Sequence, residues 1–270
     1  MSEGNEVILR MEDILVQFPL SDGTTLNACD HVTVEVRRGE TLGIVGESGS
    51  GKSTLAKVLT RQNNAADGKV IFHGEDITHI KGEALRQLRR KIQMIFQDPT
   101  AAFNPKMRIR DIICEPLMNF GLIKKDEVDA KAKELLRAVD LPEDFAGRFP
   151  HNMSGGQRQR VAIARALALE PEIIICDEAT SALDVSVQKT IIDLLTRIQK
   201  EKHISYMFIC HDLALANQFS HTMAIMEKGK LVETIHDLHE AKSDYAKKLL
   251  LSIFDITKGK KQVLPDELFQ

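Results

Sequence analysis

Long apolar runs are missing from this 270-residue sequence, and none approaches the roughly 20 residues that a membrane-spanning helix needs. The N-terminal residues, Met1 to Glu6, are polar and acidic, unlike the basic and then apolar start of a secretory signal. The hydrophobic content of 43% is still sufficient for a sizeable core. We therefore expect a chain that is soluble by itself and resides in the cytosol.

Cysteine pairs and a strong charge of either sign are also missing. The formal net charge is −3, so no overall basic field favours nucleic acid or an anionic membrane as a partner. The cysteines stand singly without Cys-x-x-Cys spacing, which argues against a metal site or a disulfide framework and predicts packing residues in a reducing compartment. They are Cys29, Cys114, Cys176 and Cys210. The sequence also contains no internal repeat and no low-complexity segment.

A glycine-rich segment matches the phosphate-binding pattern G-x-x-x-x-G-K-[ST] at every fixed position. It consists of Gly46, Glu47, Ser48, Gly49, Ser50, Gly51, Lys52 and Ser53, and Thr54 follows it. The apolar run 41–45 before it predicts a buried strand, and the spacing of 53–60 after it predicts a helix. The glycines allow several backbone N–H groups to point into one hollow, and the helix N-terminus adds a partial positive charge there. The segment therefore predicts a nucleotide phosphate site.

Two side chains complete this predicted site. Lys52 adds a full positive charge that can reach the outer phosphates of a nucleotide. The Ser53 hydroxyl is placed to ligate Mg²⁺, which keeps most of its water and bridges phosphate oxygens.

The remaining patterns alternate between strands and helices and predict an α/β fold. Residues 6–40 are rich in β pattern, and the alternation of 31–37 places Val32, Val34 and Val36 on one face. Further strands are expected at 69–72, 92–96, 172–178 and 204–210, with a closing hairpin at 223–233. Helices are expected at 82–91, 157–169, 185–200 and 244–253, followed by a loose tail. The segment 99–160 has helical character and predicts a helical insert between strands, with an apolar stripe at Val128, Ala132, Leu135, Leu136 and Val139.

Polar residues follow several of the predicted buried strands. The strand 92–96 is followed by Gln97, and the strand 172–178 ends in Asp177 and Glu178. A buried strand rarely ends in two carboxylates without a task for them, although a solvated turn is the alternative. His211 follows the strand 204–210, where it could be either a histidine at the edge of the core or a ligand of phosphate.

Two further features could contact a nucleotide. Ser154, Gly155 and Gly156 precede Gln157 at the start of a predicted helix, which makes this a second candidate phosphate site. Phe18 lies near the end of the first predicted strand, and its ring could either stack on a nucleobase or pack at the edge of the core.

In their order and spacing, these residues resemble the nucleotide-binding subunit of an ATP-binding-cassette (ABC) transporter over residues 7–235. The matching motifs are the phosphate loop Gly46–Ser53, the glutamine loop at Gln97, the signature Ser154–Gln157, the second nucleotide motif 173–178, the loop Ser181–Asp184 and the switch histidine His211. Four segments are similar to the oligopeptide/dipeptide/nickel uptake group. They are Phe96–Pro99, Asn104–Pro105, Ser154–Arg160 and Thr180–Ser186.

The sequence departs from that group at three places. Met153 stands where leucine is usual, which conserves volume, and Ala179 stands where proline is usual, which predicts a looser turn. The region Tyr245–Ser252 keeps only a trace of the group's C-terminal pattern and has no cysteine cluster after it. The last departure weakens the assignment of a substrate, not that of an ATPase.

The resemblance implies an α/β P-loop NTPase core with a mainly parallel sheet, an N-terminal antiparallel β subdomain and an inserted helical subdomain. The nucleotide-binding domain would cover residues 1–240, with the helical subdomain at about 99–160 and a C-terminal helix and tail at 241–270. It also implies that two cassettes close around two ATP molecules, so that the phosphate loop of one chain meets the signature of the other.

The resemblance further assigns roles to individual residues. Glu178 would be the catalytic base, His211 would contact the γ-phosphate, and Gln97 would sense the metal and the attacking water. Asp177 would support Mg²⁺ together with Ser53 and Gln97. The residues that would contact ATP are Phe18, Gly46 to Thr54, Ser154, Gly155, Gly156, Gln157 and Asp184.

The expected partners are a second ABC ATPase subunit, identical or homologous, two integral membrane permease subunits and an extracytoplasmic solute-binding protein, with no nucleic acid. The chain would then work at the cytoplasmic face of the membrane in the import of peptides or of a related small solute or metal complex. The segment Thr100–Pro116 is expected to form part of the groove that receives a permease helix, because Phe103, Met107 and Ile109 look exposed; the alternative is that they fill the insert's own core.

Two other kinds of ABC ATPase remain as alternatives, and a purely regulatory ATP-dependent module is a third possibility. A chromosome- or repair-type ATPase that binds nucleic acid would need a long coiled-coil insertion or zinc-binding cysteine pairs, and the sequence has neither. A translation-associated protein would need two cassettes in tandem, and the sequence has one.

Overall fold

The computed structural model describes residues 6–99 and 102–257 of the chain. The chain forms two compact units, which we describe separately. The first comprises Met1–His79 together with Met207–Gln270, and the second comprises Ile80–Tyr206. The second unit thus extends beyond the expected helical insert at 99–160 on both sides. No helix of the described residues is both long and apolar enough to span a bilayer.

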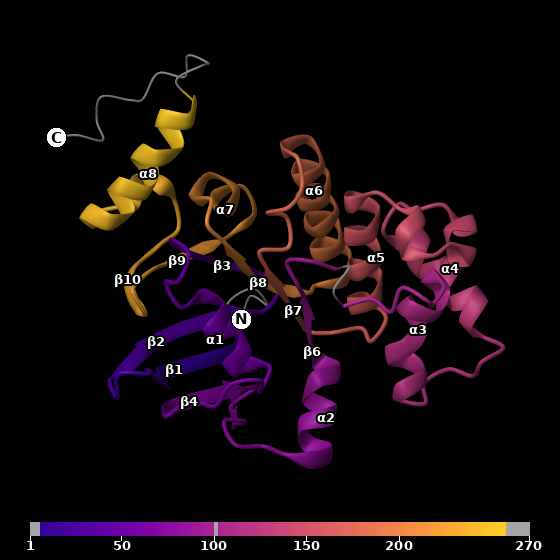
Figure 1. The fold of residues 1–270 in the computed structure, drawn as a ribbon, viewed down its shortest axis with the longest axis horizontal. Coiled ribbons are helices and arrows are strands. Elements are labelled where there is room, and N and C mark those ends of the chain that lie inside the picture. The colour runs from indigo at the N-terminus through magenta and orange to yellow at the C-terminus, as the bar shows by residue number, and fades with distance from the viewer. Residues whose placement is uncertain (1–5, 100–101, 258–270) are drawn as a thin grey trace. The chain divides into compact units, whose positions relative to one another are not determined.

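The first unit contains an antiparallel sheet with the strand order β2-β1-β4-β5, of which Figure 1 labels β2, β1 and β4. The strands are β1 (Val7–Pro19), β2 (Thr25–Arg37), β4 (Asp67–Phe72) and β5 (Glu75–Asp76). The predicted alternation is confirmed in β2, where Val32, Val34 and Val36 are all buried. They pair with β1 residues that are also buried, because alternate residues of a strand share one face.

The same unit contains a second group of strands that supports the phosphate loop. Strand β3 (Thr41–Val45) pairs in parallel with β9 (Thr222–Glu227), which pairs antiparallel with β10 (Lys230–Ile235). All five residues of β3 are buried, as expected for a short apolar strand covered on both faces. Helix α1 (Lys52–Leu59) follows the loop after β3, and helix α7 (Leu213–Phe219) packs against β3.

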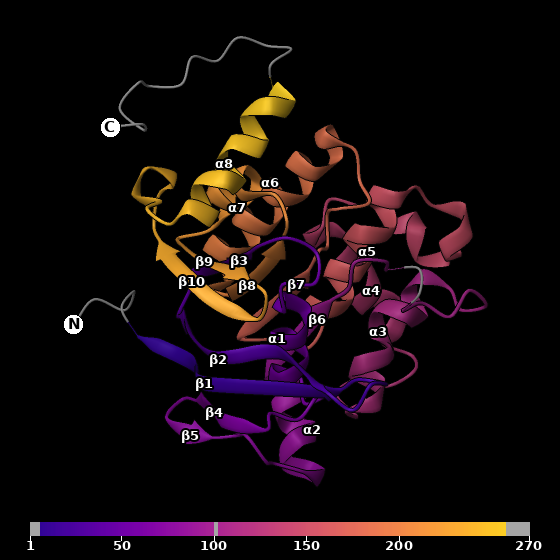
Figure 2. The same cartoon turned by 60° about the vertical axis from the view of Figure 1, so that its left-hand side comes forward.

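Strand β8 (Ser205–Cys210) leads into the second half of the first unit, and helix α8 (Asp244–Thr257) ends its described part (Figure 2). Helix α8 contacts α7. It begins where the sequence predicted and continues four residues further, whereas the predicted tail from 258 onward lies outside the described residues.

The second unit is mainly helical around one pair of parallel strands, β6 (Ile92–Ile95) and β7 (Ile173–Asp177). Its helices are α2 (Gly82–Lys91), α3 (Ile109–Asn119), α4 (Val128–Ala138), α5 (Gly155–Leu167) and α6 (Val185–Lys202), with short 3₁₀ turns at η2 (Glu143–Gly147) and η3 (Pro150–Asn152). The predicted apolar stripe of α4 is buried along its whole length and faces α3 and α5. Helix α5 begins two residues before its predicted start, because Ser154 caps it.

The expectation that Phe103, Met107 and Ile109 are exposed is wrong for two of the three. Phe103 is 6% exposed and Ile109 is completely buried, while Met107 is half-buried. Phe103 lines a cavity of only about 20 Å³ together with residues of β6 and α5, and Ile109 is the first residue of α3. These apolar side chains therefore belong to the core of the second unit, as the alternative interpretation had it. Thr100, where the proposed segment begins, lies outside the described residues.

Candidate nucleotide-binding site

The phosphate loop lies between β3 and α1, as the sequence predicted. Gly49 and Gly51 have φ values of 80° and 101°, which L-residues with a side chain rarely adopt. Two of the glycines also approach other backbone closely. A Cβ atom at Gly46 would lie 2.1 Å from the Met226 carbonyl oxygen, and one at Gly51 would lie 2.2 Å from that of Ala28. The loop therefore requires glycine both for its conformation and for the space around it.

Lys52 is only 3% exposed, and its ammonium group lies within the loop. The Nζ atom donates to the carbonyl oxygens of Gly46 at 2.7 Å and Glu47 at 2.8 Å, and to Ser50 Oγ at 3.4 Å. A buried cation surrounded by oxygens satisfies the usual requirement that buried charges have close polar partners. Ser53 and Thr54 follow on the first turn of α1 and are half-buried.

Residues that are distant in sequence hold the phosphate loop in place. The N–H of Gly229 donates to the Ser50 carbonyl at 3.0 Å, and the Cys29 thiol lies 3.6 Å from the Gly51 carbonyl. Burial raises the pKa of Cys29 to about 12, so this thiol stays protonated near neutral pH. From α8, Tyr245 Oη accepts a hydrogen bond from the Glu47 N–H at 3.0 Å. Sequence reasoning missed Cys29 and Tyr245 as neighbours of the loop, because no spacing rule relates residues so far apart.

Two other predicted site residues of the first unit are exposed. Phe18 is 39% exposed and pairs across the β1–β2 hairpin with Leu26, which is 51% exposed. Its role as a stacking surface for a nucleobase stays a prediction. His211 follows β8 directly and is exposed, and its role as a ligand of phosphate stays a prediction. The next residue, Asp212, caps α7 by accepting from two backbone N–H groups.

In the second unit, the predicted carboxylates lie where β7 ends. Asp177 is its last residue, and Glu178 follows with a φ of 48°. A positive φ is strained for a residue with a side chain, and such strain is often found at functional sites. Ser181 Oγ donates to the Glu178 carbonyl at 2.9 Å and accepts from Gln97 Nε2 at 3.2 Å. The Ser181 hydroxyl, which lies 84 positions after Gln97, thus links Gln97 to the Glu178 backbone.

The signature residues form the N-terminus of α5. Ser154 Oγ accepts from the Gln157 N–H at 3.3 Å, and Gln157 Oε1 accepts from the Ser154 N–H at 2.9 Å. This reciprocal pair is a capping box, which satisfies two backbone donors at the helix start. A Cβ atom at Gly156 would lie 2.7 Å from Val187 Cγ1 on α6, so glycine permits the close approach of α5 and α6.

Asp184 caps α6, whose start lies against the start of α5. Its carboxylate accepts from Ser186 Oγ at 2.6 Å and from the Val187 N–H at 3.0 Å. The hydrogen bond from Ser186, followed by that from the Val187 backbone, lowers the pKa of Asp184 below its usual range. The predicted site residue Asp184 therefore has a structural role at the helix N-terminus, and its contact with a nucleotide stays a prediction.

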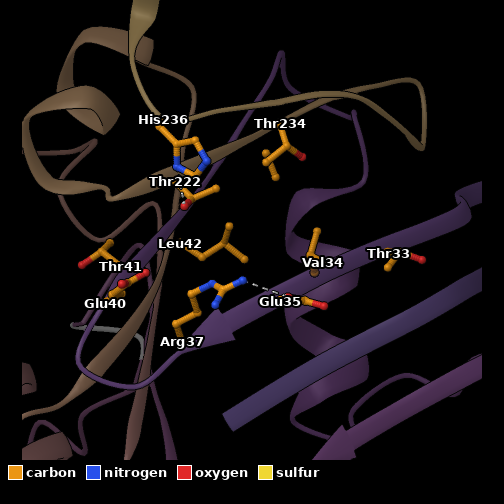
Figure 3. A pocket seen from close by; sticks show the side chains of 11 residues that line it. Thr33, Val34, Glu35, Arg37, Glu40, Thr41, Leu42, Thr222, Thr234 and His236 are labelled. Atoms are coloured by element: carbon orange, nitrogen blue, oxygen red, sulfur yellow. Dashed lines mark hydrogen bonds and ion pairs between the residues drawn. The ribbon is translucent and has the colours of Figure 1, made fainter. Parts of the chain in front are cut away.

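One cavity of the first unit lies apart from the phosphate loop. A hollow of about 320 Å³ is lined by residues of β2, β3, β9 and β10 and by the adjoining Glu40 and His236. Figure 3 shows Arg37 directed toward Glu35, and His236 against Thr222. Thr41 and Leu42 of this lining begin β3, whereas the phosphate loop follows the other end of that strand. The cavity therefore shares no residue with the predicted phosphate site.

With this geometry established, comparison with known proteins decides the family. A family described as ABC transporter matches residues 29–181, which is more than half of the chain. The chain belongs to the ABC transporter family. The family and the P-loop NTPase fold predicted from the sequence are thus confirmed, and this ABC chain is an ATPase.

Relatives of this ABC ATPase match it over most of its length. Oligopeptide transport ATP-binding protein AppF of Bacillus subtilis is 42% identical and covers 96% of this chain and 81% of its own length. Oligopeptide transport ATP-binding protein OppF of Salmonella typhimurium is 41% identical and covers 98% of this chain and 85% of its own. Among solved structures, the dimeric ATP-binding cassette MJ0796 with ADP and Pi has a TM-score of 0.76 at 28% identity, covering 84% of this chain and 98% of its own.

Proposed function

We propose that this ATPase supplies energy for peptide import through a membrane transporter. The proposal rests on the similarity to AppF and OppF, which both carry the name of oligopeptide transport ATP-binding proteins. The chain would act at the cytoplasmic face of the membrane, with two permease subunits and an extracytoplasmic solute-binding protein. A second ATPase subunit, identical or homologous, would complete the pair of cassettes, as in the dimeric structure of MJ0796.

The buried ammonium group of Lys52 is the observation that carries the nucleotide part of the proposal. It lies among the carbonyls of a strand–loop–helix motif, where the loop amides and the N-terminus of α1 favour an anion. Lys52 would bind the outer phosphates of ATP. Phe18 would stack on the base through its exposed ring, and His211 would donate a hydrogen bond to the γ-phosphate.

The donor atoms offered by the chain suit Mg²⁺, which prefers hydroxyl, carboxylate and amide oxygens and retains several waters. Ser53 and Asp177 would hold this ion, with Gln97 close to its water shell. When bound, Mg²⁺ would neutralise part of the negative charge on the phosphates. The ion would thereby favour binding of the triphosphate.

Glu178 would act as the base that orients and deprotonates the attacking water. Its backbone is held by Ser181, which also binds Gln97, so a change at Gln97 can reach the peptide of the catalytic residue. The signature residues Ser154 to Gln157 would close over the γ-phosphate bound by the other subunit, because they lie at a helix N-terminus. Hydrolysis would then require closure of the pair.

Replacing Lys52 tests the nucleotide part. Lys52→Ala should bind ATP much more weakly and should not hydrolyse it, while remaining folded by circular dichroism. Hydrolysis of ATP by Lys52→Ala at the rate of the unmodified chain would contradict the assignment of the loop.

Uptake by cells tests the transport part. Cells that lack this chain should fail to take up a labelled oligopeptide, and the unmodified chain should restore uptake whereas Glu178→Gln should not. Labelled nickel serves as the comparison substrate. Restoration of nickel uptake without peptide uptake would contradict peptide import, and co-purification with ribosomes instead of membrane subunits would contradict a transport role altogether.

A further inference from the structure

Two residues of helix α8 contact Glu47 in the phosphate loop. The Glu47 N–H donates to Tyr245 Oη at 3.0 Å, and Lys248 Nζ lies 3.3 Å from Glu47 Oε1. The two contacts differ in environment. Tyr245 is only 8% exposed, whereas the side chains of Lys248 and Glu47 are 72% and 58% exposed. An exposed ion pair contributes little to stability, so the contact with energetic weight is that of Tyr245.

This contact involves the same peptide group that holds Lys52. The carbonyl of Gly46 and the N–H of Glu47 belong to one peptide group, and no peptide among the described residues is cis. In a trans peptide the carbonyl and the N–H point in opposite directions. The carbonyl accepts from Lys52 Nζ at 2.7 Å, while the N–H donates to Tyr245 at 3.0 Å. Lys52 and Tyr245 therefore hold this peptide plane from opposite sides.

We propose that Tyr245 is a positioning residue for nucleotide binding, which acts by fixing the Gly46–Glu47 peptide that orients the Lys52 ammonium. Rotation of that peptide would break both hydrogen bonds, so the phenol oxygen limits the orientations open to the Gly46 carbonyl. Donation of the N–H to Tyr245 also polarises the carbonyl and strengthens its bond to Lys52. Burial raises the pKa of Tyr245, so its hydroxyl stays neutral through the physiological range.

Through Tyr245, helix α8 would influence nucleotide binding at the phosphate loop, although it begins at Asp244, 192 positions after Lys52. This role of Tyr245 rests on the proposed role of Lys52 toward the outer phosphates. A purely structural role for Tyr245, in packing α8 against the unit, predicts instead that its hydroxyl is dispensable and only its ring matters.

The first test replaces the hydroxyl and keeps the ring. Tyr245→Phe should bind ATP about 2- to 10-fold more weakly, as expected for the loss of one neutral hydrogen bond. Its affinity for AMP, which lacks the outer phosphates, should stay within error of the unmodified chain, and its unfolding temperature should fall by only a few degrees. The matched control is Tyr206→Phe, which removes the hydroxyl of the chain's other tyrosine and should leave ATP affinity unchanged.

The second test is a double-mutant cycle with Lys52→Met, with affinities measured by equilibrium dialysis. If Tyr245 acts through Lys52, adding Tyr245→Phe to Lys52→Met should cause no further loss of ATP affinity. An equal loss of ATP affinity in both backgrounds would overturn the inference, because Tyr245 would then act on the loop independently of Lys52. Unchanged ATP affinity in Tyr245→Phe, or an equal loss for AMP and ATP, would overturn it as well.

These variants test the role of Lys52 and the role of Tyr245 separately. If Lys52→Met binds ATP as tightly as the unmodified chain, the proposed role of the loop fails and the inference falls with it. If Lys52→Met loses affinity but Tyr245→Phe does not, only the inference fails. The pair Lys248→Ala and Lys247→Ala provides the charge control on α8. Both should change ATP affinity by less than about 2-fold, because these lysines are exposed.

Discussion

The phosphate loop and the segment from Ser154 to Asp184 both carry nucleotide motifs, yet different kinds of contact hold them in shape. Backbone and side chains from β2, the β9–β10 turn and α8 surround the phosphate loop. In contrast, Ser154 bonds to Gln157 and Asp184 bonds to Val187, each three residues away. The phosphate loop is thus held mainly by distant residues, whereas Ser154 and Asp184 are held by the caps of their own helices. Substitutions of the loop glycines should therefore lower stability more than substitutions at the helix caps do.

The largest effect is expected at Glu178, where activity and stability should separate. Glu178→Gln keeps size and hydrogen bonding but removes the base, so kcat should fall by about 10²- to 10⁴-fold. The unfolding temperature should barely change, because Glu178 is half-exposed and only its backbone is bonded to Ser181. Steady-state ATP hydrolysis and thermal unfolding measure the two quantities.

The same variant reports on closure of the two cassettes. With ATP bound and not cleaved, the closed pair should accumulate, and size-exclusion chromatography with Mg-ATP should show a dimer. A Ser154→Arg change added to it should abolish the dimer through added bulk at the helix start. If the natural partner is a different cassette subunit, size-exclusion chromatography must be carried out on a mixture of this variant and that subunit. A folded, nucleotide-bound variant that stays monomeric with its partner would contradict the closed-pair mechanism.

A matched pair of glycines tests the other side of the comparison. Gly51→Ala should lower the free energy of unfolding by about 3 kcal/mol, because φ is 101° and the new Cβ would meet the Ala28 carbonyl oxygen. Gly155→Ala should change it by less than about 1 kcal/mol, since its Cβ would lie 3.4 Å from Leu183 Cδ2 and alanine suits a helix. Urea titrations measure the free energy of unfolding of both variants. An equal loss in Gly51→Ala and Gly155→Ala would contradict the difference between the two regions.

The capping box should give a smaller and local effect. Ser154→Ala removes the acceptor for the Gln157 N–H and should cost about 1 kcal/mol of stability. Ser154→Thr retains the hydroxyl and should recover most of it. Chemical denaturation compares the two. An unchanged midpoint for Ser154→Ala would mean that tertiary packing, not the cap, determines where α5 begins.

The smallest effect at neutral pH is expected for the buried thiols. Burial raises the pKa of Cys29 and Cys176 to about 12, so both should react slowly with iodoacetamide at pH 8 until the chain unfolds. Above about pH 8.5, unfolded thiols ionise while these folded ones stay protonated, so the free energy of unfolding should fall as pH rises toward 12. Cys29→Ala should reduce that slope. Rapid labelling of Cys29 in the folded chain would show that the backbone beneath the loop opens readily.

Much of the site could be predicted because its signals are local in sequence. The strand, glycine turn and helix around Lys52 follow one another within about twenty residues, from 41 to 60, so their pattern is visible without tertiary information. The same holds for the alternating valines of β2, and for the cap at Ser154, where a Gln three residues later marks the helix start.

The wrong prediction that Phe103 and Ile109 are exposed has a physical reason. Both residues are buried, and Phe103 lines a small cavity with residues of α5, a helix that begins about fifty residues later. Hydrophobicity drives burial without specifying which distant surface will supply it.

The sequence by itself determined the family and the order of most strands and helices, because each depends on residue types at short separations, whereas the residues that it assigns to the phosphates stay predictions. Only the tertiary structure decided that Gln97 reaches the Glu178 backbone through Ser181, and that Gly46 and Gly51 lie against distant carbonyls. It also decided that Tyr245 bonds to the peptide that orients Lys52. These contacts join segments that lie far apart along the chain. The segments come together because their apolar faces are buried, and no local sequence pattern specifies which hydrogen-bonding groups then become neighbours.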